Sequence, residues 1–325
     1  MKKALSLVII IGLLTFIVAF AFSSTAFAWS QATHAYVAKT CLGIENNYLL
    51  NYNARLGCIV PDFFWYLRDR GLIDDKNIAE ELHGDTSKPC VNGVDTTWFY
   101  DLASAQVMWW QFLLKSFTEG IGTHVYADII AHNTENGYLE GPGMWVDTLL
   151  KKMGLAQEDR DAYREAAHLA LEFSVDALLV HQHGLQLADL LFSHRQAGIL
   201  EKAFQDAFDE LNLTLEFDVC TEFRKYLALM RALEKAAAFY APYLISKGLD
   251  GGSTSDFDAE PLIEAQRELS EESLDLYTQV FMILLQFPKE IYTTITDVGR
   301  GMHWEENALP DVLNFWDNPC YQLPE

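Results

Sequence analysis

Apolar residues recur at spacings of three and four along most of this chain, which is the period of an amphipathic α-helix. The pattern covers residues 97–118, 119–133, 157–182, 197–212, 219–245, 262–286 and 287–300. Alternation with a period of two, which would indicate strands, is nearly absent, and Leu, Ala, Glu and Gln dominate the periodic segments. The pattern therefore predicts an all-α protein built as a multi-helix bundle.

Polar and glycine-rich stretches interrupt this pattern. They are residues 137–143 (GYLEGPG), a stop at 181–184 (HQHG), and 248–258, the best candidate for a linker or a long surface loop. Residues 69–96 are rich in Asp, Gly, Asn and Thr, and we expect them to form a long connection over one face of the bundle. We therefore expect a helical domain over residues 29–247 with a C-terminal helical extension over residues 248–325.

The first 28 residues have the order of a secretory signal. Lys2 and Lys3 precede an apolar run, and the segment ends in the small-residue motif A-x-A at Ala28. A retained membrane anchor is the alternative, because the apolar run is about long enough to span a bilayer. The A-x-A motif directly after the run favours cleavage, so we expect residues 1–28 to be a signal peptide and the mature, secreted or periplasmic chain to begin at Trp29.

The charge of the chain limits its partners. Removing the leader takes away two lysines and no acidic residue, so the net charge moves from −23 to about −25. Such a surface repels polyanions, which disfavours nucleic acids and anionic membranes as preferred partners. None of the five cysteines forms a C-x-x-C pair, so a thiolate zinc site is not indicated. An oxidising compartment would permit up to two disulfides, whose connectivity the sequence does not reveal.

Two helical segments carry the residue types that bind metals. His124, Asp128 and His132 are four residues apart, and each step of four rotates about 40° around a helix, so the three side chains form one stripe among apolar positions. A second helical segment carries His168 and Glu172 at the same spacing. A buried stripe of imidazoles and carboxylates must be paired, hydrogen-bonded or metal-bound.

Zinc suits imidazole and carboxylate ligands better than the other first-row metals do. A single His-x-x-x-Asp pair on a helix is more often a surface ion pair. Two such segments with apolar neighbours favour a shared metal site. Asp176, one turn beyond Glu172, is a further candidate ligand, although a helix cap or an ion pair explains it equally well. The pair Trp109-Trp110 is explained about as well by a helical core as by an apolar substrate groove.

The amino terminus left by signal cleavage is a further candidate ligand. The free amine and the carbonyl oxygen of Trp29 could together chelate a metal, and His34 is close enough in sequence to add an imidazole. On helical periodicity alone, the plainer interpretation is that Trp29 is the first ordered apolar residue and that His34 opens a helix.

These residues together resemble the zinc-dependent phospholipases C of bacteria. The matching features are an early Trp and His (WSQATH, 29–34), a Gly-x-x-x-Pro-Asp motif ending at Asp62, a lone His83, and the His-x-x-x-Asp and His-x-x-x-Glu helices in that order. The three-zinc single-strand nucleases are similar in the same way. The short interval between Asp128 and His132 is similar to that in the N-terminal domain of GPI-specific phospholipase D. The resemblance covers residues 29–183.

The resemblance implies a bundle of the zinc-dependent phospholipase C type that holds two or three zinc ions. It places Asp62, His83, His124 and Asp128 on one zinc ion. The amine and carbonyl of Trp29 and His34 would hold a second, with Asp128 bridging both, and His132, His168 and Glu172 would hold a third. Asp62 would also act in catalysis by orienting or deprotonating the water that attacks phosphorus.

The expected activity is that of an exported phosphodiesterase that hydrolyses phospholipid head groups through a metal-bound hydroxide. The substrate would be a phospholipid or another phosphodiester, and a transient contact with a membrane surface is compatible with it. A nuclease or nucleotidase with the same trinuclear cluster is one alternative, and a non-catalytic zinc-binding surface protein is another. The sequence does not indicate an oligomeric state.

Overall fold

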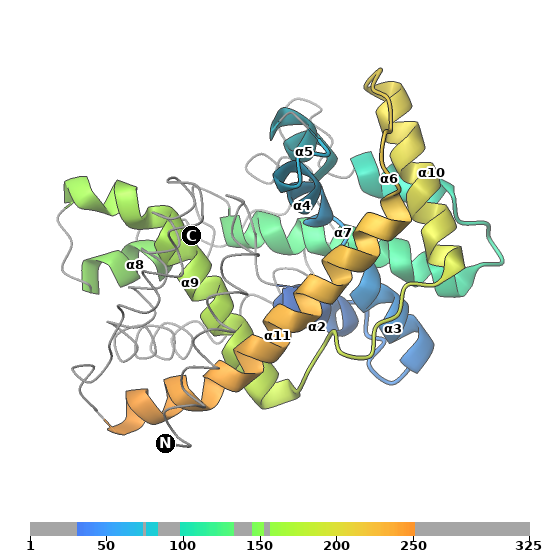
Figure 1. Ribbon diagram of the computed structural model, residues 1–325. Helices are drawn as coiled ribbons and strands as arrows, with labels where there is room; N and C mark the ends of the chain where they lie inside the picture. The colour runs from blue at the N-terminus through green and yellow to red at the C-terminus, as the bar shows by residue number, and fades with distance from the viewer. Residues whose placement is uncertain (1–30, 74–75, 84–97, 133–144, 153–156, 251–325) are drawn as a thin grey trace, which may run out of the picture.

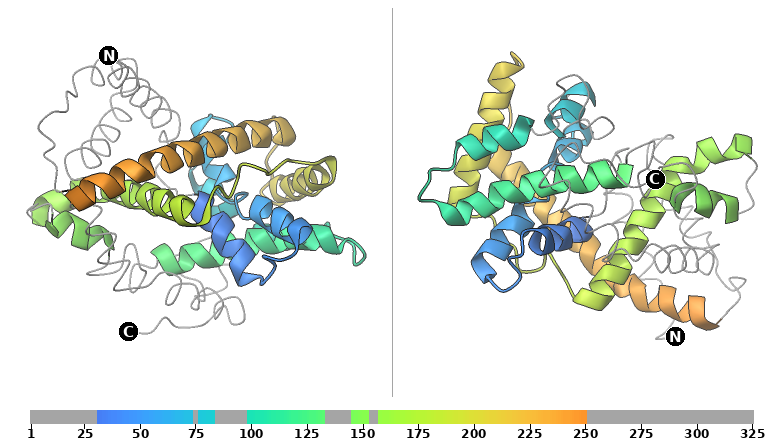
Figure 2. Two further views of the ribbon diagram at one scale, coloured as in Figure 1. Left: turned by 90° about the horizontal axis from the view of Figure 1, so that it is seen from below. Right: turned by 180° about the vertical axis from the view of Figure 1, so that it is seen from behind.

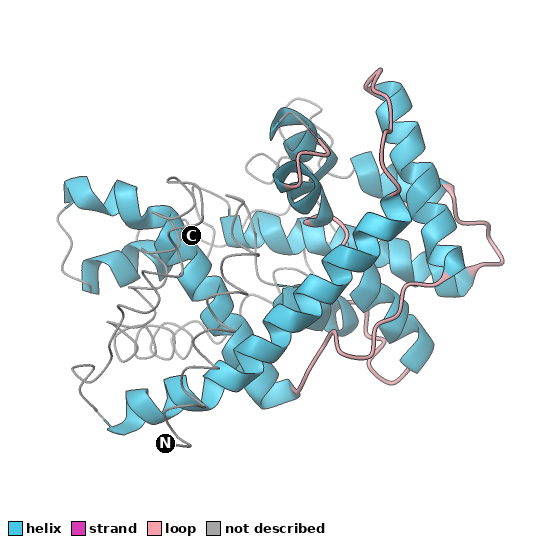
Figure 3. Ribbon diagram, viewed as in Figure 1, coloured by secondary structure: helices cyan, strands magenta, loops and turns pink. Residues whose placement is uncertain are grey.

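The computed structural model of this chain describes residues 31–73, 76–83, 98–132, 145–152 and 157–250 (Figure 1). Within these ranges the secondary structure is helical and no strand occurs (Figure 3), so the prediction of an all-α fold is confirmed. The helices are α2 (Gln31–Cys41), α3 (Tyr48–Gly57), α4 (Phe63–Asp69), α5 (Lys76–His83), α6 (Trp98–Ala105), α7 (Phe112–His132), α8 (Trp145–Lys152), α9 (Gln157–His183), α10 (His194–Glu210) and α11 (Val219–Asp250).

Helix α7 is the central helix of the described part of the chain, and it is buried along most of its length. It packs closely against α3 through two glycines. A Cβ atom at Gly57 would lie 1.8 Å from the carbonyl oxygen of Phe117, and a Cβ at Gly120 would lie 2.2 Å from that of Ala54. Only glycine allows backbones to approach this closely, so these two positions set the distance between α3 and α7.

An aromatic core lies where α4, α10 and α11 meet. Phe63 packs edge-on against Phe204 of α10 and Phe223 of α11, with ring centroids 5.8 Å and 5.2 Å away. Helices α9 and α11 contact each other and cross, as Figure 1 and the right view of Figure 2 show. Helix α9 ends at His183, where Gly184 adopts a left-handed φ of 77°, and the predicted stop at 181–184 is confirmed.

The structure corrects three predicted boundaries. The pattern over residues 97–118 is not one helix, because the chain leaves the helix after Ala105 and re-enters it at Phe112. Part of the expected connection over residues 69–96 is the short helix α5. Its Ala79 and Leu82 are buried and its Ile78 is half-buried. Helix α11 continues to Asp250, so the expected loop does not begin at residue 248.

Several predictions lie outside the described residues. These are the leader, Trp29, the break at residues 137–143, and the helices at 262–286 and 287–300. Cys41, Cys58 and Cys220 are free thiols. Among the described helices, none is both long enough and apolar enough to cross a bilayer.

Candidate metal centre

The predicted metal-binding residues come from separate elements of the bundle. Helix α2 carries His34, Asp62 directly precedes α4, and His83 is the last residue of α5. Helix α7 carries the His-x-x-x-Asp stripe, and α9 carries the His-x-x-x-Glu pair. The structure brings these side chains into two groups, and α7 contributes to both.

The first group is organised around Asp128. Its Oδ1 atom lies 3.2 Å from Nε2 of His34. Its Oδ2 atom lies 3.0 Å from Nε2 of His83 and 3.1 Å from Nε2 of His124. The Asp128 side chain is fully buried. One carboxylate oxygen therefore faces His34, and the other faces His83 and His124. A carboxylate that bridges two metal ions needs its oxygens arranged in this way.

Asp62 completes the first group from the turn before α4. Its Oδ1 atom lies 3.6 Å from Nε2 of His83 and 3.8 Å from Nε2 of His124. The other oxygen, Oδ2, accepts a short hydrogen bond from the side-chain amide of Gln31 in α2. This link holds the start of α2 to the group, and no local pattern predicts it because the two residues are 31 positions apart in the chain.

A backbone contact sets the tautomer of His124. Its Nδ1 atom lies 2.6 Å from the carbonyl oxygen of Cys58, and a carbonyl can only accept, so Nδ1 carries a proton. Burial and then the neighbouring His34 lower the pKa of His124 to about 3, and the ring is therefore neutral. The remaining nitrogen, Nε2, must present a lone pair to the group, as in histidines that bind metals through one nitrogen and are oriented through the other.

Imidazole nitrogens and carboxylate oxygens converge in the first group. Nε2 of His83 faces Nε2 of His124 at 3.2 Å. Within the described residues, Asp62 Oδ1 and both oxygens of Asp128 accept no hydrogen bond of adequate geometry. Buried carboxylates are costly unless a cation or a donor compensates them. The first group therefore fits a metal cation, and neutral imidazole with carboxylate is a ligand set that zinc accepts.

The two buried carboxyl groups differ in their electrostatics. Burial, followed by the repulsion of Asp128, raises the pKa of Asp62 well above its ordinary value. Burial acts in the same direction on Asp128, but His124 and His34 outweigh it and hold the pKa of Asp128 well below its ordinary value. In a protein without bound metal, Asp128 is thus the charged member of the pair.

The second group joins the end of α7 to the middle of α9. Nε2 of His168 lies 2.5 Å from Oε1 of Glu172, and Nε2 of His132 lies 3.9 Å from the same oxygen. The rings of His132 and His168 are stacked, with centroids 4.7 Å apart. Burial raises the pKa of Glu172 to about 7, and the neighbouring His168 opposes this rise. Three ligand-type atoms within 4.8 Å of one another could hold one ion.

Asp176 does not join either group. It is buried on α9, where its carboxylate accepts hydrogen bonds from the backbone N–H groups of Ala32 and Thr33 at 3.1 Å and 2.8 Å. The Thr33 hydroxyl donates to it as well, at 2.7 Å. Of the alternatives for Asp176, the structure shows a helix cap. The capped helix is α2 and not α9, the helix to which Asp176 belongs.

Three further predictions concern His83, Trp29 and the pair Trp109-Trp110. His83, which the resemblance placed in the first group, lies there. Trp29 lies outside the described residues, two positions before the first residue of α2. Trp109 and Trp110 do not belong to the core, because their exposed fractions are 92% and 53%.

A family model described as zinc dependent phospholipase C matches residues 33–229 of the chain. The matched range includes all the residues of the two groups described above and most of the helices. Comparisons with curated proteins and with solved structures found no significant match.

Proposed function

The chain belongs to the zinc-dependent phospholipase C family, and from that premise we propose that it is an exported zinc phosphodiesterase that hydrolyses phospholipid head groups. The observation that carries the proposal is the first group of side chains, in which three imidazoles meet two buried carboxylates, and Oδ1 of Asp62 and both oxygens of Asp128 accept no hydrogen bond within the described residues. Export is supported by the leader-like residues 1–28.

We propose that the ligands divide as the resemblance suggests. Asp62, His83, His124 and Asp128 would hold one ion, since their facing atoms are 3.0–3.8 Å apart. The position of His34 on the other side of Asp128 supports a second ion there, completed by the amine and carbonyl of Trp29. His132, His168 and Glu172 would hold a third.

Zinc in such a site supplies Lewis acidity toward phosphate oxygens and toward water. The protein's own contribution would be to orient the attacking water and to accept its proton. Asp62 Oδ1 is the best-placed atom for this, because the hydrogen bond from Gln31 occupies only Oδ2. Burial of Asp62 keeps bulk water away from the proton that it would receive.

The choice of a phospholipid over a nucleic acid rests on charge. The chain has a net charge of −23, and a long polyanion would have to approach it against that field, whereas one zwitterionic head group would not. A nuclease with the same metal centre is therefore the second candidate.

The test is a metal count by inductively coupled plasma mass spectrometry, combined with hydrolysis of a small panel of lipid and nucleotide phosphodiesters. Protein that begins at Trp29 should hold at least two zinc ions and cleave phosphatidylcholine. Fewer than two ions would refute the proposed metal centre. Cleavage of single-stranded DNA but not of phosphatidylcholine would favour the nuclease, and full zinc occupancy without any turnover would favour a non-catalytic protein.

The contribution of Trp29 can be tested separately by adding one residue before it. The extra residue removes the free amine from Trp29, so zinc content and activity should both fall relative to the chain that begins at Trp29. Equal zinc content in the two forms would remove Trp29 from the ligand set and leave the ligands on α7 and α9 in place.

A further inference from the structure

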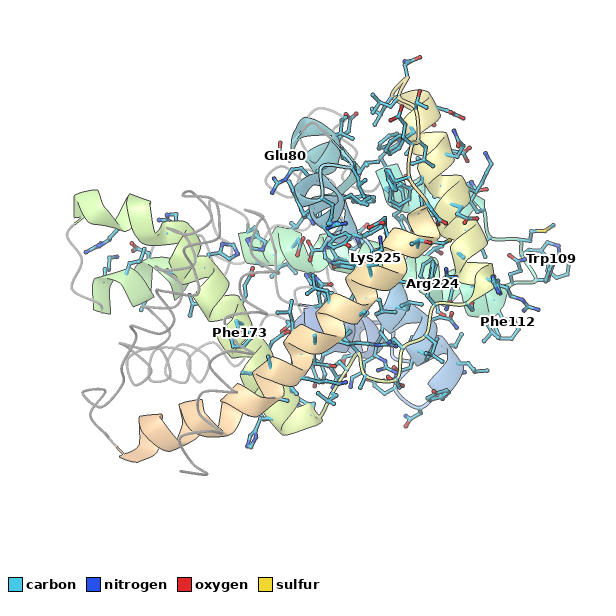
Figure 4. All side chains as sticks on the ribbon, viewed as in Figure 1. Glu80, Trp109, Phe112, Phe173, Arg224 and Lys225 are labelled. Carbon is cyan, nitrogen blue, oxygen red and sulfur yellow. The ribbon has the colours of Figure 1, made fainter. Side chains whose placement is uncertain are left out.

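The connection between α6 and α7 exposes the largest apolar side chains in the described part of the chain. We define the aromatic loop as residues 106–112. In it Met108 is 56% exposed, Trp109 92%, Trp110 53% and Phe112 64%. Figure 4 shows Trp109 and Phe112 projecting from the end of the bundle, away from the other helices. Apolar side chains gathered in this way usually mark a contact surface.

The backbone of the aromatic loop is held without any help from these side chains. The N–H of Gln111 donates to the carbonyl of Met108 at 2.8 Å, and the Gln111 side chain accepts a bond from the Met108 N–H at 3.2 Å. Gln106 anchors the base of the loop by donating to Asp206 of α10 at 3.0 Å. The turn is therefore built by polar groups, and its apolar side chains are left available for an external contact.

The charge pattern around the aromatic loop narrows the kind of partner. No charged residue occurs between Asp101 and Lys115, although the whole chain has a net charge of −23. Trp and Phe are the side chains that settle at the boundary between lipid head groups and acyl chains. A neutral, aromatic, protruding turn on an acidic protein fits a zwitterionic bilayer better than it fits an anionic one.

A bilayer also suits the size and shape of the loop better than a second copy of this chain does. A specific protein interface needs about 800 Å² from each partner and a complementary surface. A single protruding turn provides neither, whereas a fluid bilayer needs no matching hollow. We propose that the aromatic loop docks the protein on phosphatidylcholine-rich membranes, an inference that rests on the proposed phospholipase function for its biological purpose.

The aromatic loop is far from the candidate metal centre. Asp128 lies sixteen residues beyond Phe112 on α7, which is about 24 Å along the helix at 1.5 Å per residue. The aromatic loop therefore does not touch a phosphate at the metal centre. Both regions can reach one membrane only if α7 lies at a low angle to the bilayer plane, so docking would also orient the metal centre toward the head groups.

The test compares the zinc-loaded wild type with Trp109→Ser combined with Trp110→Ser. A matched control is Tyr48→Ser, which removes an aromatic ring that is 64% exposed on α3. Binding is measured by brief co-sedimentation in the cold with phosphatidylcholine vesicles, with and without added phosphatidylserine. Activity is measured on the same vesicles and on a short-chain phosphatidylcholine below its micelle concentration.

The double variant should bind phosphatidylcholine vesicles about tenfold more weakly or worse, because two interfacial indoles are lost. Its activity on vesicles should fall in parallel, while its activity on the short-chain monomer and the behaviour of Tyr48→Ser stay unchanged. Adding phosphatidylserine should not strengthen the binding of the wild type.

Wild-type affinity in the double variant, or no vesicle binding by the wild type, would overturn the docking proposal. So would a wild-type dimer that becomes a monomer in the double variant, because the surface would then join two copies of the chain. Vesicle binding that depends on the tryptophans, in a protein that hydrolyses neither substrate, would leave the docking proposal standing and refute the proposed function instead.

Discussion

Replacing Asp176 by alanine tests how α2 is held beside the metal centre. Asp176 is 3% exposed, and its carboxylate accepts the backbone N–H groups of Ala32 and Thr33 and the hydroxyl of Thr33. The first N–H groups of a helix have no partner inside that helix. A carboxylate at this end also interacts favourably with the helix dipole. Asp176, on a helix that is distant in the sequence, therefore supplies the hydrogen-bond acceptor that the first N–H groups of α2 lack.

The structure sets the expected magnitude. Asp176→Ala would leave two backbone donors and one hydroxyl buried without their acceptor. Each such group costs about 1–3 kcal/mol, and entry of water into the space left by the carboxylate offsets part of this. We expect a loss of about 3–5 kcal/mol in the free energy of unfolding. Asp176→Asn keeps one acceptor oxygen and loses the charge, so we expect a loss of about 1–2 kcal/mol.

The measurement is urea unfolding in the presence of a chelator, so that zinc binding does not contribute to stability. Asp209→Asn is the matched control, because Asp209 is exposed on α10 and should change the free energy of unfolding by less than about 0.5 kcal/mol. After loading, Asp176→Ala should hold about one zinc ion fewer, since α2 would no longer fix His34. A loss of less than about 1 kcal/mol with full zinc content would refute the reasoning.

The other predictions concern the helix contacts and the metal ions. Gly57→Ala should cost about 3 kcal/mol or more, because its Cβ would meet the carbonyl of Phe117. Gly198→Ala has open space on α10 and should add about 1 kcal/mol; urea unfolding checks both. Glu172→Gln should remove about one zinc ion per chain and spare the rest, as a metal count will show. Chelation should lower Tm by several degrees, reversibly on adding zinc, and an unchanged Tm would contradict a zinc centre that forms only in the folded state.

Periodicity predicted the long helices because their apolar stripes repeat over several turns. Helices α9, α10 and α11 lie close to the predicted ranges. The short helices α3 to α5 were not predicted as helices, since seven to ten residues give only two or three turns over which an apolar stripe can repeat. Helix α2 was anticipated only in the interpretation that His34 opens a helix. The break between α6 and α7 was missed for a different reason. Met108 and Trp109 continue the apolar spacing of a core helix, and hydrophobicity alone does not distinguish a buried side chain from one that meets another surface.

The candidate ligands could be found from the sequence where helical spacing placed them together, as for His124 and Asp128. The positions of Asp62 and His83 came only from the resemblance, because no local pattern links them to α7. The contacts that hold the site together could not be predicted. Gln31 reaches Asp62 across 31 positions, and Asp176 reaches Thr33 across 143. Such contacts depend on how helices pack, and that information is spread over the whole core.

Helix α7 ties the two groups together mechanically. His124 and Asp128 belong to the first group and His132 to the second, so one rigid helix fixes their separation at one turn, about 6 Å along the axis. The same helix is positioned against α3 by Gly120, whose neighbours leave no room for a side chain. The close contact between α3 and α7 therefore fixes where α7 holds its ligands for both groups. The ligands on α2 and α9 are positioned instead by contacts between residues that are far apart in the sequence. Changes in those contacts would alter metal affinity while α7 stays in place.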